Sequence, residues 1–341
     1  MRAAVYYSNR DLRVQEVPTP KIGTGELLIR VEASGICGSD VMEWYRKDRV
    51  PLILGHEVAG VIEEAAEGVK YKKGLRVALS HHVPCGSCHY CLGGHETTCE
   101  TLRKTNFDPG GFCEYLRLPK INVDSGVFPL PDSVTFEEAT FVEPLACVLR
   151  GQHQVGFKPG KSILVIGSGI AGLLHIHLAR VRDAGFILAT DILEYRVRQA
   201  KRFGAQEAFL SQEYSPEALR KLNNGQLADI VIVTTGALPA LQQAISSVER
   251  GGTILFFAPT EKGLKVPIPF NDLFWRTEVT MTSSYAGSPQ DYQEALGIIA
   301  QKKLQLIDMV THRLKLDEIG EGFKLVQEAR ESIKVIIYPH K

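Results

Sequence analysis

The sequence lacks an excess of charge of either sign. Its 341 residues include 39 Lys and Arg and 39 Asp and Glu, so the formal net charge at pH 7 is zero. A chain with this balance presents no broad positive field that would attract a nucleic acid or an anionic membrane. We therefore expect neither a nucleic acid nor a membrane as its partner.

Long apolar runs are also missing. No window approaches the roughly 20 apolar residues that a membrane-spanning helix needs. The first residues, MRAAVYYSNRDLRV, carry charges within their apolar pattern, which indicates a strand and not a signal peptide. Without an export signal we expect a cytoplasmic protein, and the reducing cytoplasm disfavours disulfides.

Cysteine is scarce outside one loop. Four of the seven cysteines lie in VPCGSCHYCLGGHETTCE, at Cys85, Cys88, Cys91 and Cys99. Four thiolates with this spacing can converge on one ion and complete the closed tetrahedral shell of a structural zinc. The usual ferredoxin spacings for iron–sulfur clusters differ, and a disulfide pair fits a reducing compartment poorly. The loop therefore predicts a zinc ion that stabilises the fold and takes no part in chemistry.

The pattern of strand-like and helical segments changes near the middle of the sequence. Residues 1–151 contain many short strand patterns broken by glycine and proline, and few helical ones. Further on, helical segments such as 170–182 and 238–247 alternate with six apolar strands, predicted at 162–167, 186–191, 207–210, 229–235, 253–258 and 279–284. This alternation predicts an α/β fold, with a doubly wound parallel sheet of the Rossmann type over 152–287.

The tail, 288–341, contains two helical segments and a final strand pattern, SIKVIIYP. A seventh strand is one more than the six-stranded nucleotide-binding fold needs. We therefore expect the tail to return and complete the first, β-rich domain.

A glycine-rich turn, VIGSGIAG, follows the first of the six strands and opens a helix. Gly167, Gly169 and Gly172 have the spacing G-x-G-x-x-G, with Ile170 and Ala171 between the last two. In this setting the glycines permit a tight turn and let a pyrophosphate approach the backbone at the helix N-terminus. The pattern predicts a dinucleotide site.

Asp191 bears on which dinucleotide binds. It ends the next strand, nineteen residues after Gly172. A carboxylate at this place can bind the ribose hydroxyls and repels a 2′-phosphate, which favours NAD over NADP. Arg196 and Arg198 follow closely, and their positive charge weakens the preference for NAD. They either form a solvated helix face or flank the adenine.

A second set of metal-binding residue types lies outside the cysteine loop. GICGSD contains Cys37, Ser39 and Asp40, LGHEVAG contains His56 and Glu57, and FVEPLAC contains Glu143. A thiolate, an imidazole and a carboxylate can hold a zinc ion and leave its fourth position open. Taken singly each has a simpler explanation, since a lone cysteine is usually a small buried hydrophobe and Glu-Pro often marks a helix start.

Together these motifs resemble the zinc-containing medium-chain alcohol dehydrogenases, nearest to their sorbitol (polyol) and threonine dehydrogenase branch. GICGSD, GHEVAG, the cysteine loop, EPLAC and VIGSGIAG occur in the family's order over the whole chain. The resemblance implies a β-rich, GroES-like catalytic domain, completed by the tail, beside a Rossmann NAD-binding domain. It also implies two zinc ions per chain, one catalytic and one structural, and a homodimer or homotetramer.

The resemblance assigns roles to the open set. Cys37, His56 and Glu143 would be ligands of the catalytic zinc, and Glu57 would be an exchangeable fourth ligand or a carboxylate beside the ion. Asp40 would accept the other N–H of His56 and fix its orientation. The zinc would lower the pKa of a substrate hydroxyl, Ser39 would take its proton, and hydride would pass to NAD.

One departure from the family is Met42, where many alcohol dehydrogenases place a histidine that relays the proton outward. Water, the cofactor ribose, or the pair His81 and His82 could replace that path. The expected substrate is a secondary alcohol of a polyol, cyclitol or sugar, oxidised to a ketone. L-Threonine 3-dehydrogenase and simple alcohol dehydrogenase remain alternatives. A non-catalytic zinc- or nucleotide-binding relative would not need Cys37, His56 and Glu143 together.

Overall fold

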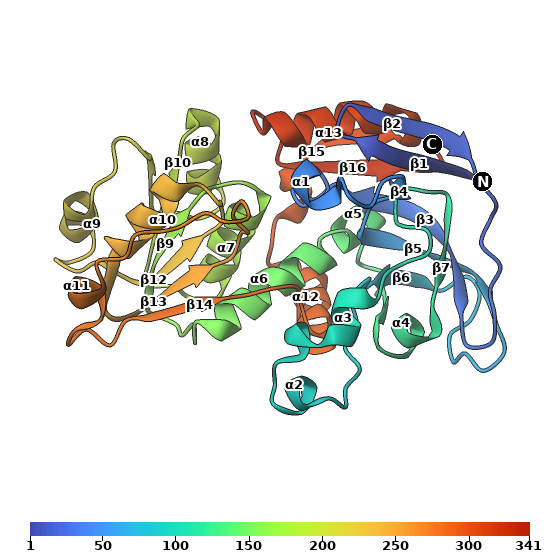
Figure 1. Ribbon diagram of the computed structural model, residues 1–341, viewed down its shortest axis with the longest axis horizontal. Coiled ribbons are helices and arrows are strands. Elements are labelled where there is room, and N and C mark those ends of the chain that lie inside the picture. Colours follow the sequence, from blue (N-terminus) through green and yellow to red (C-terminus); the bar gives the residue numbers. More distant parts are fainter. The chain divides into compact units, whose positions relative to one another are not determined.

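The computed structural model describes all 341 residues (Figure 1). The chain forms two compact units. The first comprises Met1–Ala146 together with Ala286–Lys341, and the second comprises Cys147–Tyr285. The tail therefore belongs to the same unit as the N-terminal part of the chain.

The first unit is built on a seven-stranded sheet of largely antiparallel strands. Its order is β15-β16-β3-β5-β6-β8, and β7 also pairs with β3. These strands are β3 (Leu27–Gly35), β5 (Glu57–Ala65), β6 (Arg76–Leu79), β7 (Tyr115–Leu118), β8 (Val127–Pro129), β15 (Val310–Lys315) and β16 (Lys334–Tyr338). A second, three-stranded sheet has the order β2-β1-β4, with β1 (Arg2–Ser8), β2 (Asp11–Glu16) and β4 (Leu52–Ile53).

Two strands from opposite ends of the chain meet at the centre of the large sheet. In β3, Ser34 and Gly35 pair antiparallel with Ile337 and Ile336 of β16, and Gly35 also pairs with Glu57 of β5. The apolar side chains of β3 and β5 form one face of a buried core with Leu27, Ile29 and Val31 fully buried. Burial of this alternating apolar set fixes the register, because a slip of one residue would turn the set outward.

Short helices and turns connect the strands of the first unit. They are α1 (Glu43–Arg46), α2 (His89–Leu92), η1 (Glu96–Thr98), α3 (Glu100–Lys104), α4 (Lys120–Ser125), α5 (Phe136–Ala139), α12 (Pro289–Ala300), η2 (Leu306–Met309), η3 (Leu316–Glu318) and α13 (Ile319–Glu328), while α6 (Val142–Gln154) runs on into the second unit. The start of α12 follows from a capping box between Ser288 and Asp291, with Pro289 at its first position.

The sequence does not predict β15, so the expected tail of two helices and one strand is incomplete. β15 lies at the edge of the sheet and pairs only with β16. Its sequence, VTHRLK, has only two large apolar side chains because much of an edge strand faces solvent. The apolar alternation that reveals a strand is therefore weak here.

The second unit contains the predicted parallel sheet, which is confirmed. All six strands are parallel in the order β11-β10-β9-β12-β13-β14. They are β9 (Ser162–Ile166), β10 (Phe186–Asp191), β11 (Glu207–Leu210), β12 (Ala228–Val233), β13 (Val248–Phe256) and β14 (Thr280–Ser283). In order of appearance this is the arrangement 3-2-1-4-5-6 of the Rossmann fold, whose ligands bind beyond the carboxyl ends of the strands.

Helices follow the strands of the second unit as expected for right-handed crossovers. They are α7 (Ile170–Val181), α8 (Glu194–Arg202), α9 (Pro216–Leu222), α10 (Leu238–Ile245) and α11 (Phe270–Phe274). The largest difference from the predicted boundaries is at β13, which begins at Val248 and not at 253. The register against β12 shifts there, and Gly251 has a φ of +73°, so the strand begins with a bulge. No helix in the structure is both long enough and apolar enough to cross a membrane.

A buried histidine makes the stability of the second unit depend on pH. His175 on α7 is fully buried, and neither ring nitrogen has a hydrogen-bond partner. Burial lowers its pKa to about 3. The unfolded chain, with a histidine pKa of about 6.5, therefore binds a proton between pH 6.5 and 3 that the folded chain does not, and stability falls as the pH falls through this window.

We expect His175→Met to flatten this pH dependence. Between pH 7.5 and 5 the histidine should cost the wild-type protein about 2 kcal/mol of unfolding free energy, and the variant should not lose that share. Denaturant unfolding at both pH values measures the difference. His153→Gln, at an exposed position on α6, serves as the control and should keep the wild-type slope. Equal slopes for His175→Met and wild type would contradict the assignment.

Candidate metal centres and dinucleotide site

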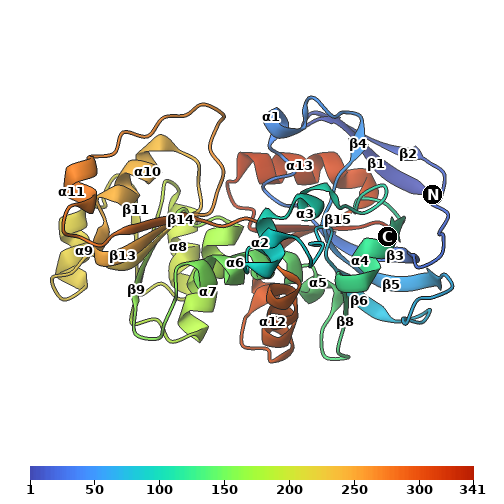
Figure 2. The same ribbon diagram turned by 60° about the horizontal axis from the view of Figure 1, so that its bottom comes forward.

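The four cysteines of the predicted structural zinc site converge in the structure. Their loop carries α2, η1 and α3 and is coloured teal in Figures 1 and 2. The sulfur atoms of Cys85, Cys88, Cys91 and Cys99 all lie within 4.8 Å of one another. The Sγ–Sγ distances are 3.5 Å for Cys88 and Cys91, 3.6 Å for Cys99 and Cys85, and 3.9 Å for Cys85 and Cys91.

This cluster fits a tetrahedral zinc ion. Zinc–sulfur bonds of about 2.3 Å place the four sulfur atoms about 3.8 Å apart, close to the distances found. Backbone amides of Cys88 and Cys85 donate to the sulfur atoms of Cys85 and Cys99 at 3.3 and 3.5 Å. Hydrogen bonds from Ser87 and from the Cys88 amide lower the pKa of Cys85 to about 5, which favours the thiolate that a metal needs.

The second candidate centre begins at the turn that follows β3. Asp40 is fully buried, and its Oδ2 accepts from the Cys37 amide at 3.0 Å, while its own amide donates to the Cys37 carbonyl at 3.0 Å. The Ser39 amide donates to Cys37 Sγ at 3.5 Å. The turn thereby holds the thiol of Cys37 and the half-buried Ser39 side by side.

The imidazole of His56, which precedes β5, lies close to the turn that carries the thiol of Cys37. Its Nδ1 lies 3.4 Å from Asp40 Oδ1, so the carboxylate can orient the ring as predicted for a metal-binding histidine. Burial alone would lower the pKa of His56, but the charge and hydrogen bond of Asp40 raise it well above its usual value. Burial likewise opposes ionisation of Asp40, yet His56 and the Cys37 amide lower the pKa of that carboxyl.

Glu57 lies close to both residues. One ligand atom each from Cys37, His56 and Glu57 lies within 4.8 Å of the others. Glu57 is also ion-paired through Oε2 with Lys334 Nζ, and both side chains are almost completely inaccessible, at 1% and 0%. Gly35 makes this pair possible, because a Cβ at that position would collide with both Glu57 and Lys334.

Glu143 does not belong to the converging group. It is buried at 7% exposure in the first turn of α6, and its carboxylate is not among the ligand atoms that lie within 4.8 Å of one another. Its role as a zinc ligand therefore stays a prediction.

Two further polar side chains border the site. The ring of His81 lies 4.9 Å from that of His56, and its Nδ1 is buried without a hydrogen-bond partner. Burial and the neighbouring charges lower the pKa of His81 well below its usual value, so the ring is neutral at pH 7. Arg46 donates to the Ser39 carbonyl at 3.3 Å and lies 4.0 Å from Asp40 Oδ1.

Each of the three positions in the predicted dinucleotide turn has a different structural reason for being glycine. Gly167 has a φ of +92°, which L residues rarely adopt, and a Cβ on Gly172 would overlap the Gly167 carbonyl. A Cβ on Gly169 would meet nothing within 4 Å, so open space lies beside the backbone at the N-terminus of α7. Ile170 and Ala171 form the first turn of that helix. This arrangement leaves room for a phosphate near unsatisfied amides.

Asp191 ends β10 beside this turn. Its Oδ2 accepts from the Ser168 amide at 2.7 Å and its Oδ1 from the Leu193 amide at 3.0 Å. The carboxylate is thus anchored next to the glycine turn, with lone pairs left for a ribose. Arg196 is buried on α8 at 5% exposure, and burial lowers its pKa against the opposing charge of Asp191. Arg198 is solvated, with 64% of its side chain exposed.

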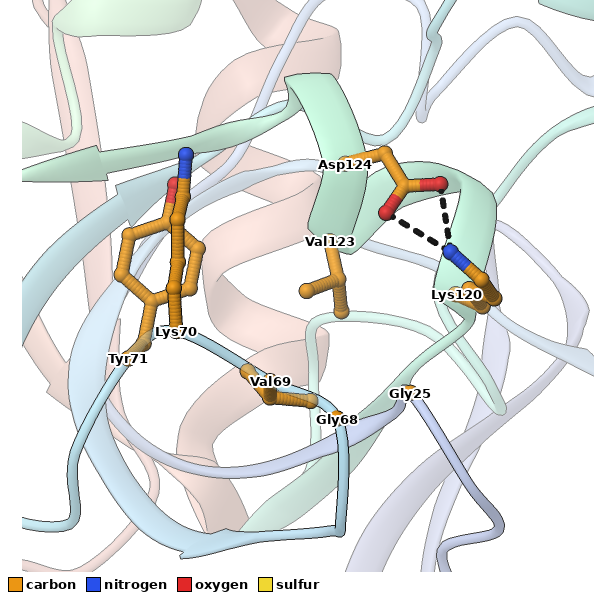
Figure 3. A pocket seen from close by; sticks show the side chains of 8 residues that line it. All are labelled: Gly25, Gly68, Val69, Lys70, Tyr71, Lys120, Val123 and Asp124. Carbon is orange, nitrogen blue, oxygen red and sulfur yellow. Dashed lines mark hydrogen bonds and ion pairs between the residues drawn. The ribbon is translucent and has the colours of Figure 1, made fainter.

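A small surface hollow of about 160 Å³ lies elsewhere in the first unit. In Figure 3 it is bordered by the turn Gly68–Tyr71 and by Lys120 and Asp124 of α4. Lys120 pairs with Asp124 at 2.9 Å, and Lys70 lies over the ring of Tyr71. No residue of either candidate metal centre lines it, so it is not part of the candidate functional site.

Sequence reasoning missed Lys334 and Arg46. A signal existed for Lys334, since it is the only charge in the stretch IKVIIY, where it begins the buried strand β16, and a lysine in a buried strand needs a partner. Arg46 follows the metal-binding motif in an exposed-looking stretch, EWYRKDR, which carries no such signal.

Comparison with known proteins agrees with this geometry. The model of the alcohol dehydrogenase GroES-like domain matches residues 23–132, and the model of the zinc-binding dehydrogenases matches residues 171–301. The chain is 30% identical to a sorbitol dehydrogenase of Bacillus subtilis, over 100% of this chain and 98% of that one. It is 32% identical to an alcohol dehydrogenase of Geobacillus stearothermophilus, over 99% of each. The solved structure of an alcohol dehydrogenase from Thermus sp. ATN1 matches with a TM-score of 0.87 and 28% identity over 99% of each chain. The predicted resemblance and fold class are confirmed.

We expect Cys88→Ser to remove one of two zinc ions. The three remaining thiolates cannot close the tetrahedral shell, so the zinc content should fall from about two to about one per chain and the unfolding temperature should fall. Metal analysis and thermal unfolding measure both. Cys113→Ser is the matched control, since Cys113 is a buried thiol of the same unit outside the cluster. A zinc content unchanged by Cys88→Ser would rule out the closed site.

Proposed function

Since this chain belongs to the zinc-binding alcohol dehydrogenases, in the branch of the sorbitol dehydrogenases, we propose that it oxidises a secondary alcohol of a polyol, cyclitol or sugar to a ketone, reversibly and with NAD. The observation that carries this proposal is the convergence of Cys37, His56 and Glu57 at one place beside Ser39. A thiolate and an imidazole with carboxylates nearby are the donors of a catalytic zinc centre, and a closed structural centre is already provided by the cysteine loop.

Cys37 and His56 would hold the catalytic zinc, with Glu57 as the carboxylate that converges with them and Glu143 as a further candidate ligand. The glycine turn with Asp191 would hold the dinucleotide. When bound, the zinc acts as a Lewis acid on the substrate oxygen and NAD accepts hydride. Asp40 contributes by orienting His56, since it is buried and lies 3.4 Å from His56 Nδ1. Ser39, on the same turn as Cys37, accepts the hydroxyl proton of the substrate.

A polyol is favoured over a simple alcohol because the chain is 30% identical to two sorbitol dehydrogenases over nearly its whole length. Because Met42 occupies the position of the family's relay histidine, water or the cofactor ribose would carry the proton onward from Ser39.

NAD is favoured over NADP by Asp191, whose carboxylate is fixed beside the glycine turn. The proposal also includes a homodimer or homotetramer in the cytoplasm. All seven cysteines are free thiols in the structure, which suits a reducing compartment.

The test is NADH formation by the zinc-loaded protein with NAD and a panel of polyols, cyclitols, sugar phosphates, threonine and simple alcohols. We expect a polyol or cyclitol to respond most strongly. Cys37→Ser should abolish turnover while NAD binding, measured by calorimetry, persists, because the glycine turn lies on a separate unit. Activity in a Cys37→Ser variant that holds only one zinc would refute the open metal site, and a response to threonine or ethanol alone would favour the alternatives.

A further inference from the structure

Residues 80–83 connect the two candidate metal centres. They follow β6 and lead into the cysteine loop, whose first thiol is Cys85. At one end of this segment, the ring centre of His81 lies 4.9 Å from that of His56 in the open centre. The ring of His82 packs against His81, with 3.9 Å between the ring centres. A continuous row of three imidazole rings therefore leads from the start of the cysteine loop to the open centre.

Thr105 ties the two ends of the cysteine loop together. It follows α3, the last helix of the loop, and its Oγ1 accepts from the Val83 amide at 2.9 Å and donates to the Leu102 carbonyl at 3.0 Å. The Thr105 carbonyl lies 2.8 Å from His82 Nδ1. Because a carbonyl oxygen can only accept, Nδ1 carries the hydrogen and donates it. The ring of His82 is thus bound to the residue at which the loop ends.

The shape of the cysteine loop depends on its ion. Its helices α2, η1 and α3 contain four, three and five residues, which is too short for a helix to be stable without other support. Much of the loop is also solvated, with Leu92 78% exposed. Four thiolates around one ion supply the missing constraint. Loss of that ion should therefore release α3, and with it the carbonyl that anchors His82.

The backbone of His81 has a separate anchor. Asn122 on α4 is fully buried, and its Nδ2 donates to the carbonyls of Ser80 and His81 at 3.0 and 2.9 Å. The main chain at His81 is therefore fixed by α4, outside the cysteine loop. The His82 ring, which is bonded to Thr105, is the part of this segment that follows the position of the loop.

The ring of His56 is held from two directions. Asp40 Oδ1 lies 3.4 Å from its Nδ1, and the ring of His81 packs beside it. The orientation of a metal-binding imidazole matters, since loss of the groups that orient it typically weakens metal affinity 10- to 100-fold. A displaced His81 would remove one of the two restraints on His56.

We infer that His82 is a positioning residue that couples the closed metal centre to the open one. It transmits the position of the cysteine loop, through its bond to Thr105 and its packing on His81, to the imidazole of His56. The closed centre then has a second role besides stabilising its own loop. The inference rests on the proposed function, because it requires an ion at the open centre.

The test uses protein with zinc in the cysteine loop and Co²⁺ at the open centre, where the visible absorption of Co²⁺ reports the geometry of its ligands. His82→Phe keeps a ring against His81 but cannot donate a hydrogen bond. His82→Asn retains a donor close to the position of Nδ1 and loses the ring. Cys88→Ser empties the closed centre, and a double variant combines it with His82→Phe. The Co²⁺ spectrum and the rate of Co²⁺ release to a chelator are measured for each.

His340→Phe is the matched control. His340 also bonds a backbone carbonyl, that of Glu114, at 3.0 Å from Nε2, and it packs against an aromatic ring, that of Tyr115. It belongs to the same unit as both centres, and none of its ring contacts involves a residue of either one. The variant should match wild type in spectrum and in release rate.

We expect His82→Phe to shift the Co²⁺ spectrum and to speed release about tenfold, since one restraint on His56 is lost. His82→Asn should release Co²⁺ more slowly than His82→Phe, because the bond to Thr105 persists. Cys88→Ser should change the spectrum and the release rate in the same direction as His82→Phe. The double variant should release Co²⁺ no faster than the faster single variant, because both changes interrupt one path.

The outcomes separate two failures. If wild-type protein binds Co²⁺ only at the cysteine loop, the open centre is absent, and both the proposed function and this inference fall. If Co²⁺ binds at the open centre and His82→Phe leaves spectrum and release rate unchanged, the inference alone is overturned. It is also overturned if His82→Asn matches His82→Phe, or if the effects of His82→Phe and Cys88→Ser add in full. Should Cys88→Ser fail to fold, the two His82 variants still decide.

Discussion

The antiparallel pairing of β16 with β3 is the contact on which the metal-binding unit depends. It places Ile336 opposite Gly35, two residues before Cys37, and it brings Lys334 to the strand that carries Glu57. Without this pairing β3 would lose one neighbour, the turn that carries Cys37 would lose its support, and the buried carboxylate of Glu57 would lose its ion-pair partner. The centre of the sheet and the chemistry of the site are therefore held by the same backbone hydrogen bonds.

Much of the fold follows from patterns that are local in sequence. Each strand of the parallel sheet is a short apolar run, so it can be located from its own residues alone, as for β9 and β10. The cysteine loop and the glycine turn are equally local, since the spacing of the four thiols and of the three glycines is enough to identify each motif. The edge strand β15 has few apolar residues, the short strands β4, β7 and β8 have too few residues to show a pattern, and β13 begins with a bulge at Val248, so this reasoning did not locate these features.

The site is less predictable because its decisive contacts are long-range. Glu57 and Lys334 are 277 residues apart in sequence, and nothing near either residue identifies its partner. The approach of His81 to His56 likewise depends on how β5 and β6 pair, and not on any spacing within a motif. Family resemblance supplied roles for Cys37 and His56, but it could not show that the carboxylate next to His56 is already engaged by a lysine.

Because the first unit is divided between two distant stretches of chain, the two units become able to fold at different times during translation. The nucleotide-binding unit, Cys147–Tyr285, is complete in sequence before β16 has been translated, whereas the metal-binding sheet must wait for it. Domains fold as units while the chain emerges from the ribosome, in N-terminal to C-terminal order. Here the discontinuous unit reverses that order: the middle of the chain can fold first, and the thiol of Cys37 stays in an unfinished sheet until Lys334 arrives.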